Sequence, residues 1–530
     1  MAFNQSCLFW MTPSKYCLAM VKTPPLAMKK RVIPSSKDVC RRMETRVLRF
    51  DLERPALEYY FHELYQAFDP GVKNILAGEA DGVLSQKTEG DAVILSLAWS
   101  GKKALERRFQ FDTVEESLEN SVYKGFLYDL LCEYFGRSLQ WGTLTGIKPV
   151  KMVQKLADAG LSVEAIERKF EDDYRVSSDR TRLLIELAEK QRSFIIPEID
   201  KDKKRRVSIY VGIPLCPSKC AYCSFVSTIV DKKRINLDTY FNNLLTEAKR
   251  VGQLFKTMEI AVDTLYIGGG TPTVLSAEQL AALMKTLANA FDLSQLREYT
   301  LEAGRPDTIT REKLEVAKKH GVSRICLNPQ SMNARTLKAV ARPWENGLTE
   351  ELAGLIKSIG FKTMNMDLII GLGDEGPDDF FYTLEKVIAL EPENITIHNL
   401  SIKSGSEIKN QRGISVELGY GEAFYQAVKK RLHDQSYDPY YLYRLKYTRG
   451  NSENIGYAKP GHEGIYNIMM MAERQTTIGI GAGSTGNIYD PANDSIQKVF
   501  TVKDVKTYNE RFEELIEKKL TAYALLKNRA

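Results

Sequence analysis

From residue 207 onward, short apolar runs rich in β-branched residues alternate with amphipathic helical patterns. The runs that predict strands are 207–214, 263–268, 298–303, 323–328, 363–370 and 394–402, and most gaps carry a helical pattern, at 237–257, 277–291, 310–320, 348–359 and 377–390. Strands and helices that alternate in this way form a parallel sheet. Six units are fewer than the eight of a closed barrel, so the pattern predicts an open, partial (β/α)6 barrel. Its chemistry is expected at the C-terminal ends of the strands.

Two regions of mixed pattern flank the predicted barrel. Before it, strand-like runs at 45–51, 91–99 and 104–111 are accompanied by helical patterns at 55–68, 114–136, 149–158, 162–173 and 178–193. The glycine-rich run 141–149 breaks these helices and either holds an anion at a helix N-terminus or forms a tight turn. We predict an α/β protein with an N-terminal α+β domain (43–199), a barrel core (200–435) and a C-terminal α+β domain (436–530) that covers the substrate.

The first 42 residues differ from the rest of the chain. They carry eight Lys or Arg and one acid, Asp38, and lack periodicity, so we expect residues 1–42 to be a disordered basic extension. We interpret it as an upstream extension with the natural start at Met43; an organelle transit peptide is the alternative. The whole chain has a formal charge of +6, so the folded part is near neutral and no nucleic-acid surface is expected. No apolar run reaches the ~18 residues of a membrane span.

Cys216, Cys220 and Cys223 form a C-x3-C-x2-C motif directly after the first predicted barrel strand. Three thiolates on one loop can hold three irons of a [4Fe–4S] cluster and leave the fourth iron open for the amino and carboxylate groups of S-adenosylmethionine. Structural zinc is the alternative, but it needs a fourth ligand, usually from a second pair, and the other cysteines are isolated. The chain is long and shows no secretory signal, so a disulfide framework is not expected. Such a cluster needs a reducing, oxygen-poor setting, and we expect the cytoplasm.

Polar residues and glycines follow several other predicted strands. The second strand ends in Gly268-Gly-Gly-Thr-Pro-Thr273, where missing Cβ atoms let the backbone approach an amino-acid-like ligand. Glu302 ends the third strand, Gln330 follows the fourth, and Asp367 interrupts the fifth; Arg342, further along, is placed to hold a carboxylate. Their shared position at strand ends predicts a binding site.

Together these motifs resemble the radical SAM superfamily and, within it, the oxygen-independent coproporphyrinogen III dehydrogenase family. The runs Trp141-Gly-Thr-Leu-Thr-Gly-Ile-Lys148, Glu302-Ala-Gly-Arg-Pro306 and Asn454-Ile-Gly-Tyr-Ala-Lys-Pro-Gly461 are similar to its HemZ-type branch, and the resemblance covers residues 43–520. It implies that the three cysteines bind the cluster. The positions it implies for contacts with S-adenosylmethionine are Tyr210, Tyr222, Gly269, Gly270, Thr271, Glu302, Gln330, Arg342 and Asp367.

The resemblance implies an oxygen-independent oxidative decarboxylation of coproporphyrinogen III to protoporphyrinogen IX in heme (porphyrin) biosynthesis. The partners are then a tetrapyrrole substrate, an unknown electron donor and an unknown acceptor, and we expect a monomer. One feature departs from the dehydrogenases, which carry a fourth cysteine two residues after the third, where this chain has Phe225. A Cys-x-Phe ending is similar to heme-chaperone relatives. A heme carrier with a radical SAM core, or an enzyme acting on another tetrapyrrole, therefore stays open.

A tetracarboxylate substrate calls for cationic groups in its pocket. The candidates by position are Arg305, Lys403, Arg444, Lys446 and Lys459, although an ordinary solvated charge is the commoner role for each. His398, on the sixth predicted strand, is the candidate heme ligand if the protein is a carrier.

Overall fold

The computed structural model describes residues 46–70, 72–110, 116–145, 148–195, 205–225, 228–230, 236–401, 420–445 and 452–528. The chain divides into two compact units, Met1–Arg46 and Val47–Ala530. The predicted basic extension therefore lies outside the described residues, and all the described helices and strands belong to the second unit. No described helix is both long and apolar enough to cross a membrane.

The first part of this unit is a five-stranded sheet in the order β2-β1-β3-β4-β5. Its elements are β1 (Val47–Leu52), α1 (Glu58–Phe68), β2 (Lys73–Ile75), β3 (Gly82–Glu89), β4 (Ala92–Trp99), β5 (Leu105–Gln110) and α2 (Glu116–Phe135). The predicted hairpin between the last two strands is confirmed, with Ala92 opposite Gln110. Strand β3 was not predicted from the sequence. Its buried positions include Gly82 and Gln86, which carry no apolar side chain to mark the alternation.

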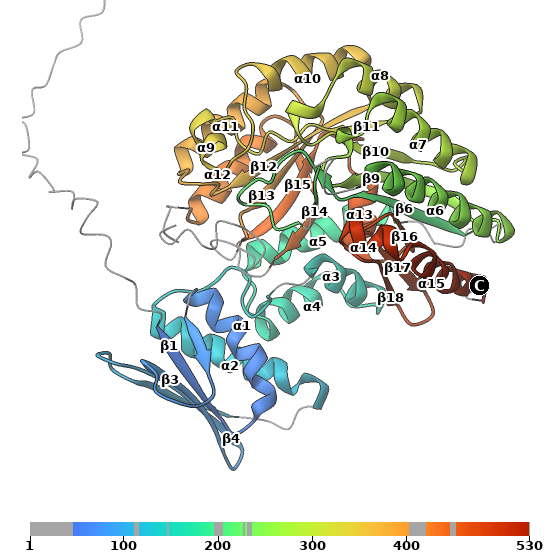
Figure 1. Ribbon diagram of the computed structural model, residues 1–530. Helices are drawn as coiled ribbons and strands as arrows, with labels where there is room; N and C mark the ends of the chain where they lie inside the picture. Colours follow the sequence, from blue (N-terminus) through green and yellow to red (C-terminus); the bar gives the residue numbers. More distant parts are fainter. Residues whose placement is uncertain are drawn as a thin grey trace, which may run out of the picture. The chain divides into compact units, whose positions relative to one another are not determined.

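The predicted partial barrel is confirmed (Figure 1). Its six parallel strands pair in chain order, as β6 (Arg206–Ile213), β9 (Ala261–Gly269), β10 (Glu298–Glu302), β11 (Arg324–Cys326), β12 (Thr363–Ile370) and β13 (Asn394–Asn399). The helices on its outer side are α6 (Leu237–Thr257), α7 (Ala277–Ala290), α8 (Arg311–Lys319), α10 (Leu348–Ile359) and α11 (Pro377–Ala389). Apolar residues such as Ile209 and Ile267 join the core with these helices. Polar residues such as Thr264 and Thr300 alternate with them along the strands.

Strands from the C-terminal region extend the barrel sheet at both edges, which makes eleven strands in all. Beside β13 lie β15 (Glu453–Ala458) and β14 (Asp438–Arg444), both antiparallel to their neighbours. Beside β6 lies the parallel strand β16 (Thr477–Ile480), followed by β17 (Thr485–Asp490) and β18 (Ser495–Phe500). The two sequence regions therefore share one sheet.

Helix α13 (Ile465–Ala472) and the turn before it bind the N-terminal ends of the barrel strands. The carbonyl of His462 accepts hydrogen bonds from Arg324 (2.8 Å) and Asn394 (3.1 Å), the first residues of β11 and β13. The carboxylate of Glu298, the first residue of β10, accepts from the backbone N–H of Ile465 at 2.9 Å. This end of the barrel is thus occupied by protein, which leaves the C-terminal ends for a ligand.

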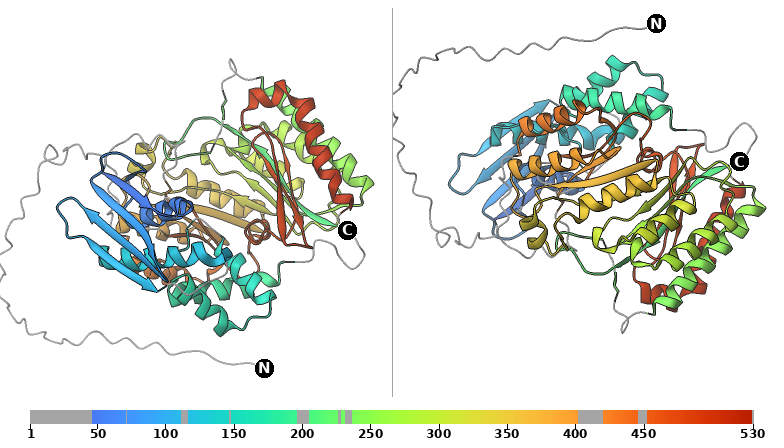
Figure 2. Two further views of the ribbon diagram at one scale, coloured as in Figure 1. Left: turned by 90° about the horizontal axis from the view of Figure 1, so that it is seen from below. Right: turned by 90° about the horizontal axis from the view of Figure 1, so that it is seen from above.

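Helices α3 (Pro149–Asp158), α4 (Val163–Arg168) and α5 (Ser178–Arg192) share the large core with the barrel. Val153 and Leu184, for example, belong to the same core as Ile209 of β6, whereas residues 48–131 form a core of their own. The change of core thus falls between residues 131 and 141. The predicted domain boundaries stay predictions. The remaining helices are α9 (Ala334–Ala339), α12 (Glu422–His433), α14 (Val505–Glu510) and α15 (Phe512–Ala524), and Figure 2 shows them from two further sides.

Candidate active site

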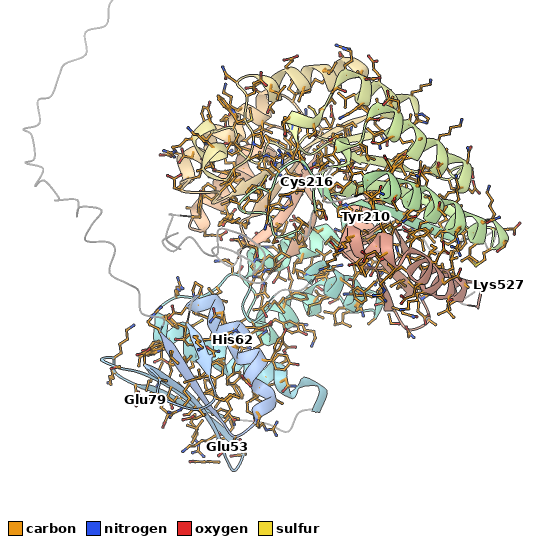
Figure 3. All side chains as sticks on the ribbon, in the orientation of Figure 1. Glu53, His62, Glu79, Tyr210, Cys216 and Lys527 are labelled. Atoms are coloured by element: carbon orange, nitrogen blue, oxygen red, sulfur yellow. The ribbon has the colours of Figure 1, made fainter. Side chains whose placement is uncertain are left out.

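The loop that carries the three cysteines leaves the C-terminal end of β6, and Figure 3 labels Tyr210 within that strand and Cys216 in the loop. A two-residue strand, β7 (Leu215–Cys216), pairs with β8 (Thr228–Ile229) and holds the start of the loop. Cys216 and Cys220 are buried, Cys223 is half-buried, and none is in a disulfide. Three thiols on one loop, at the end of the barrel formed by the C-terminal ends of its strands, match the donor set of an open iron–sulfur cluster.

Two arginines brace this loop, Arg305 from the segment after β10 and Arg342 from the segment after α9. The guanidinium of Arg305 donates to the carbonyl and to the hydroxyl of Ser218, both at 2.9 Å, and forms an ion pair with Asp307 at 2.7 Å. Arg342 lies 3.2 Å from the hydroxyl of Tyr222 and 3.8 Å from the sulfur of Cys220. Arg305 was predicted as a substrate contact, but its buried guanidinium already has protein partners, so it positions the loop instead.

Arg342 combines this role with a favourable charge. Its guanidinium donates to the carbonyls of Gly304 (2.8 Å) and Asn328. These contacts hold a cation beside a sulfur, where it favours the thiolate and an anionic cluster. The predicted contact between Arg342 and a carboxylate of the cofactor stays a prediction.

The glycine run after β9 packs directly against the cysteine loop. A Cβ on Gly270 would lie 2.5 Å from the carbonyl oxygen of Leu215 and 2.9 Å from the sulfur of Cys216. Gly269 has a φ of +117°, a conformation that side chains rarely adopt. The hydroxyl of Thr271 lies 3.4 Å from the same sulfur. The missing side chains at these glycines therefore leave room for the cysteine loop itself. The predicted role of these glycines, a close approach of the backbone to the cofactor, would be a second reason for their small size.

Glu302 is buried at the end of β10 and held in one orientation. Its two carboxylate oxygens accept from the hydroxyl of Tyr266 at 2.8 Å and from the backbone N–H of Gly269 at 3.0 Å. Burial raises the pKa of Glu302 to about 7, and these two hydrogen bonds only partly oppose the shift. A buried carboxylate of this kind is suited to accept from a cationic or hydroxyl group of a ligand.

Asp367 and His398 face each other across the barrel strands β12 and β13. The Nε2 atom of His398 lies 3.7 Å from a carboxylate oxygen of Asp367, and its Nδ1 atom lies 3.0 Å from the hydroxyl of Tyr443. Asn365 donates to the other oxygen of Asp367 at 2.8 Å. The hydrogen bond from Asn365 thus offsets part of the cost of a carboxylate within an apolar strand. His398, which the sequence left as a lone strand histidine, belongs to this polar cluster.

Two amide side chains near the end of β11 have carbonyl oxygens that are buried without a hydrogen-bond partner among the described residues. They belong to Asn328 and Gln330. The backbone of Gln330, with a φ of +68°, bridges to β12 through the carbonyl of Asp367 (2.9 Å) and the N–H of Ile369 (3.0 Å). Buried polar atoms are normally paired, so two unpaired acceptors at strand ends fit a site that a polar ligand completes.

Three tyrosines stack inside the barrel. The ring of Tyr266 lies 5.9 Å from that of Tyr210 and 4.6 Å from that of Tyr466, which α13 contributes. The sequence predicted only Tyr210, from the resemblance. Tyr266 was detectable as an aromatic residue on the polar side of a strand. Tyr466 had no signal, because it comes from a helix about 200 residues further along the chain.

The other predicted cationic contacts have protein partners or lie outside the described residues. Arg444 lies 4.8 Å from the centre of the Trp141 ring and donates to the carbonyl of Leu144; burial lowers its pKa to about 9. Lys459 lies 5.1 Å from the ring centre of Tyr437. Lys403 and Lys446 fall outside the described residues.

The run that begins at Trp141 makes structural contacts with the C-terminal region. The indole N–H of Trp141 donates to Glu453 at 2.7 Å, and Lys148 binds Glu473 at 2.7 Å. A Cβ on Gly142 would lie 2.1 Å from the carbonyl oxygen of Tyr174. These contacts account for the described part of the run as a packed turn.

No three His, Cys, Asp or Glu side chains within the described ranges converge as ligands of one metal ion. An iron–sulfur cluster makes a different demand, because each thiolate binds a separate iron. The donor set, the cation beside Cys220 and the glycines that make room for the loop all fit the larger group.

Comparisons of the sequence and of the structure show which known proteins this chain is similar to. A model of the radical SAM superfamily matches residues 210–387. HemZ of Bacillus subtilis (strain 168), described as an oxygen-independent coproporphyrinogen-III oxidase-like protein, is 37% identical over 450 residues, which cover 82% of this chain and 88% of HemZ. The heme chaperone HemW of Lactococcus lactis is 29% identical over 285 residues, or 53% of this chain and 69% of HemW. The solved structure of coproporphyrinogen III oxidase (HemN) from Escherichia coli covers 62% of this chain and 72% of its own, with 23% identity and a TM-score of 0.49.

The protein is therefore a member of the radical SAM superfamily, whose cofactors are a [4Fe–4S] cluster and S-adenosylmethionine. Within the superfamily, it belongs to the family of oxygen-independent coproporphyrinogen III oxidase-like proteins that includes HemZ. The predicted family, fold and cofactors are confirmed. The individual contact residues stay predictions.

The raised pKa of Glu302 leads to an expected pH dependence. If Glu302 makes the predicted contact with S-adenosylmethionine, its ionised form accepts hydrogen bonds better than the protonated acid, and the affinity should rise roughly tenfold between about pH 6 and 8. Without ligand, the same shift lowers stability as the pH rises from the ordinary carboxyl range toward 7. Titration calorimetry on the reconstituted protein measures the affinity. Glu302→Gln should flatten the profile; an equal slope in that variant would show that Glu302 does not cause the dependence.

Proposed function

We propose that the protein is an oxygen-independent coproporphyrinogen III dehydrogenase, a radical SAM oxidoreductase that converts two propionates of its substrate to vinyl groups. One observation carries the proposal. Three free thiols on one loop lie at the same barrel end as the buried acceptor Glu302, in a chain that is 37% identical to HemZ along most of its length. We place this reaction in a reducing, oxygen-poor cytoplasm, because an open cluster is easily oxidised.

When bound, a reduced cluster and S-adenosylmethionine would supply one-electron radical chemistry able to take hydrogen from a propionate β-carbon, and the electron left after loss of carbon dioxide would pass to an external one-electron acceptor. The chain's own residues prepare this step. Cys216, Cys220 and Cys223 hold the cluster, and Arg342 keeps positive charge beside Cys220. Glu302, fixed by Gly269, orients the cofactor through its amino or ribose groups.

The remaining barrel residues shape the space in which the radical reacts. Tyr210 and Tyr266 form an aromatic wall that limits where the cofactor and the substrate can lie. Asn328 and Gln330 offer buried acceptors to polar groups. Positioning of this kind is the protein's main contribution when a cofactor supplies the reactive species.

A second candidate is a heme carrier with the same core. Its support is His398, which lies in the polar cluster with Asp367 and Tyr443 and can present an imidazole to a metal if that cluster opens. The similarity to heme chaperones over about half of the chain is consistent with it. Stable heme uptake by the pure protein that disappears in His398→Ala would favour the carrier.

An anaerobic assay tests the two candidates together. Reconstituted protein, reductant, S-adenosylmethionine and coproporphyrinogen III are combined, and protoporphyrinogen and 5′-deoxyadenosine are quantified. We expect both products in a fixed ratio, because each decarboxylation consumes one radical. Formation of 5′-deoxyadenosine without porphyrin product would contradict the dehydrogenase and favour heme handling.

A further inference from the structure

Large apolar side chains are exposed around the cysteine loop. Nine large hydrophobic residues are exposed in the described part of the chain, and three of them, Phe225, Ile229 and Trp344, adjoin this loop, with exposed fractions of 75%, 48% and 48%. Phe225 is the residue whose backbone N–H binds the thiol of Cys223. Ile229 is paired with Cys216 in the short β7–β8 ladder. Trp344 lies two residues after Arg342.

A groove of about 500 Å³ lies between α9 and the segment that ends at Trp344, and of these three residues Trp344 lines it. Three cations line it, Arg335, Lys338 and Arg342, together with Ala334, Ala341 and Pro343, and no acidic residue among those described does so. Arg335 is 64% exposed; its guanidinium donates to both carboxylate oxygens of Asp379 at 3.4 Å and lies 3.8 Å from a carboxylate oxygen of Asp374. We call Phe225, Ile229, Arg335, Lys338 and Trp344 the loop rim.

The loop rim is connected to the thiols by short contacts. Arg342 lines the groove and also reaches the sulfur of Cys220 at 3.8 Å. The carbonyl of Val340, in the same segment, accepts from the backbone N–H of Ala221 at 2.9 Å. The cluster site therefore lies directly beneath an exposed surface that is both apolar and cationic.

We propose that the loop rim is the docking surface of a small one-electron carrier protein with an acidic face around its redox group. The proposal rests on the proposed function, which requires an iron–sulfur cluster, and it concerns the protein that reduces this cluster. One electron leaves the carrier and enters the cluster, so the carrier is oxidised by one electron and the cluster is reduced by one electron. Exposed apolar patches mark interaction sites, and Trp and Arg are the side chains that dominate interface energies. The cations select an acidic partner and accelerate its encounter.

The test compares reduction of the cluster by a protein and by a small molecule. The variant is Trp344→Ser/Lys338→Glu, and the matched control is Phe500→Ser/Lys498→Glu, an exposed aromatic and lysine on the edge strand β18. The protein electron donor is the hydroquinone form of flavodoxin, a small acidic flavoprotein. The small-molecule electron donor is dithionite. Stopped-flow absorbance follows the cluster without any tetrapyrrole present.

We expect the second-order rate constant with flavodoxin to fall at least about tenfold in the rim variant and to lose most of its salt dependence. The rate with dithionite, the iron content and the control variant should not change. An unchanged flavodoxin rate overturns the proposal. If the rim variant instead alters the oligomeric state, the surface covers a second copy. Because no tetrapyrrole is used, failure of the proposed reaction leaves this result intact.

Discussion

Cys220→Ser should abolish cluster binding. Cys220 is buried in the loop between Cys216 and Cys223, and Arg342 lies 3.8 Å from its sulfur. Removing one of three thiolates leaves two ligands, too few to retain an open cluster. Iron and sulfide per chain should fall from about four each to near zero after anaerobic reconstitution. Cleavage of S-adenosylmethionine should become undetectable.

Cys132→Ser is the matched control, because Cys132 is a free, half-buried cysteine outside the loop. We expect its iron content and absorbance spectrum to equal those of the unchanged protein. Circular dichroism of both variants separates loss of the cluster from loss of the fold. Unchanged iron in Cys220→Ser, with the fold intact, would refute the cluster assignment.

Lys519→Met should destabilise the barrel by about 3–5 kcal/mol, because it leaves a buried carboxylate without its counterion. Lys519 and Glu247 are 2% and 1% exposed, and their nitrogen and oxygen lie 2.6 Å apart. The lysine also donates to the carbonyl of Gly479 at 3.0 Å, and Glu247 accepts from the backbone N–H of Gly481 at 3.1 Å. The pair thus joins α6 and α15 to the end of β16, which lies beside β6 and its cysteine loop.

Urea-induced unfolding of the pure protein measures this effect. Lys518→Met is the matched control: Lys518 is 67% exposed and paired with Glu514 four residues away, a solvent-screened interaction whose loss should change stability little. The double variant Glu247→Gln/Lys519→Met should recover part of the lost stability, because no buried charge remains. Equal midpoints for Lys519→Met and Lys518→Met would show that the buried pair does not stabilise the fold.

Periodicity predicted the barrel well because each strand and helix buries one face, and local alternation records that burial. The predicted strand at 363–370, for example, matches β12, Thr363–Ile370. The strands beyond the barrel were harder to predict. Several residues of β14 and β15 are tyrosine or glycine, and the ring of Tyr441 occupies the space in which a Cβ on Gly456 would lie. Such complementarity between distant residues leaves no periodic signal.

The cation assignments show the same limit. Arg305 and Arg444 were predicted as substrate contacts from their places at a strand end and in the C-terminal domain. Position along a chain does not identify the partners of a long side chain. Arg305 binds Ser218 of the cysteine loop, and Arg444 packs on Trp141, some 300 residues earlier in the chain. Both are buried, and a buried guanidinium requires partners from its own protein.

The amino-acid sequence by itself determined the class of chemistry, because the spacing of Cys216, Cys220 and Cys223 on one loop limits the metal group that they can hold. It also determined the order of the barrel elements through local burial patterns. Only the tertiary structure decided which distant residues complete the site: Tyr466 from α13, Arg342 beside Cys220, and His398 beside Asp367. The physical reason is that spacing and periodicity are short-range properties of a chain, whereas a site is assembled by the packing of segments that are far apart in sequence.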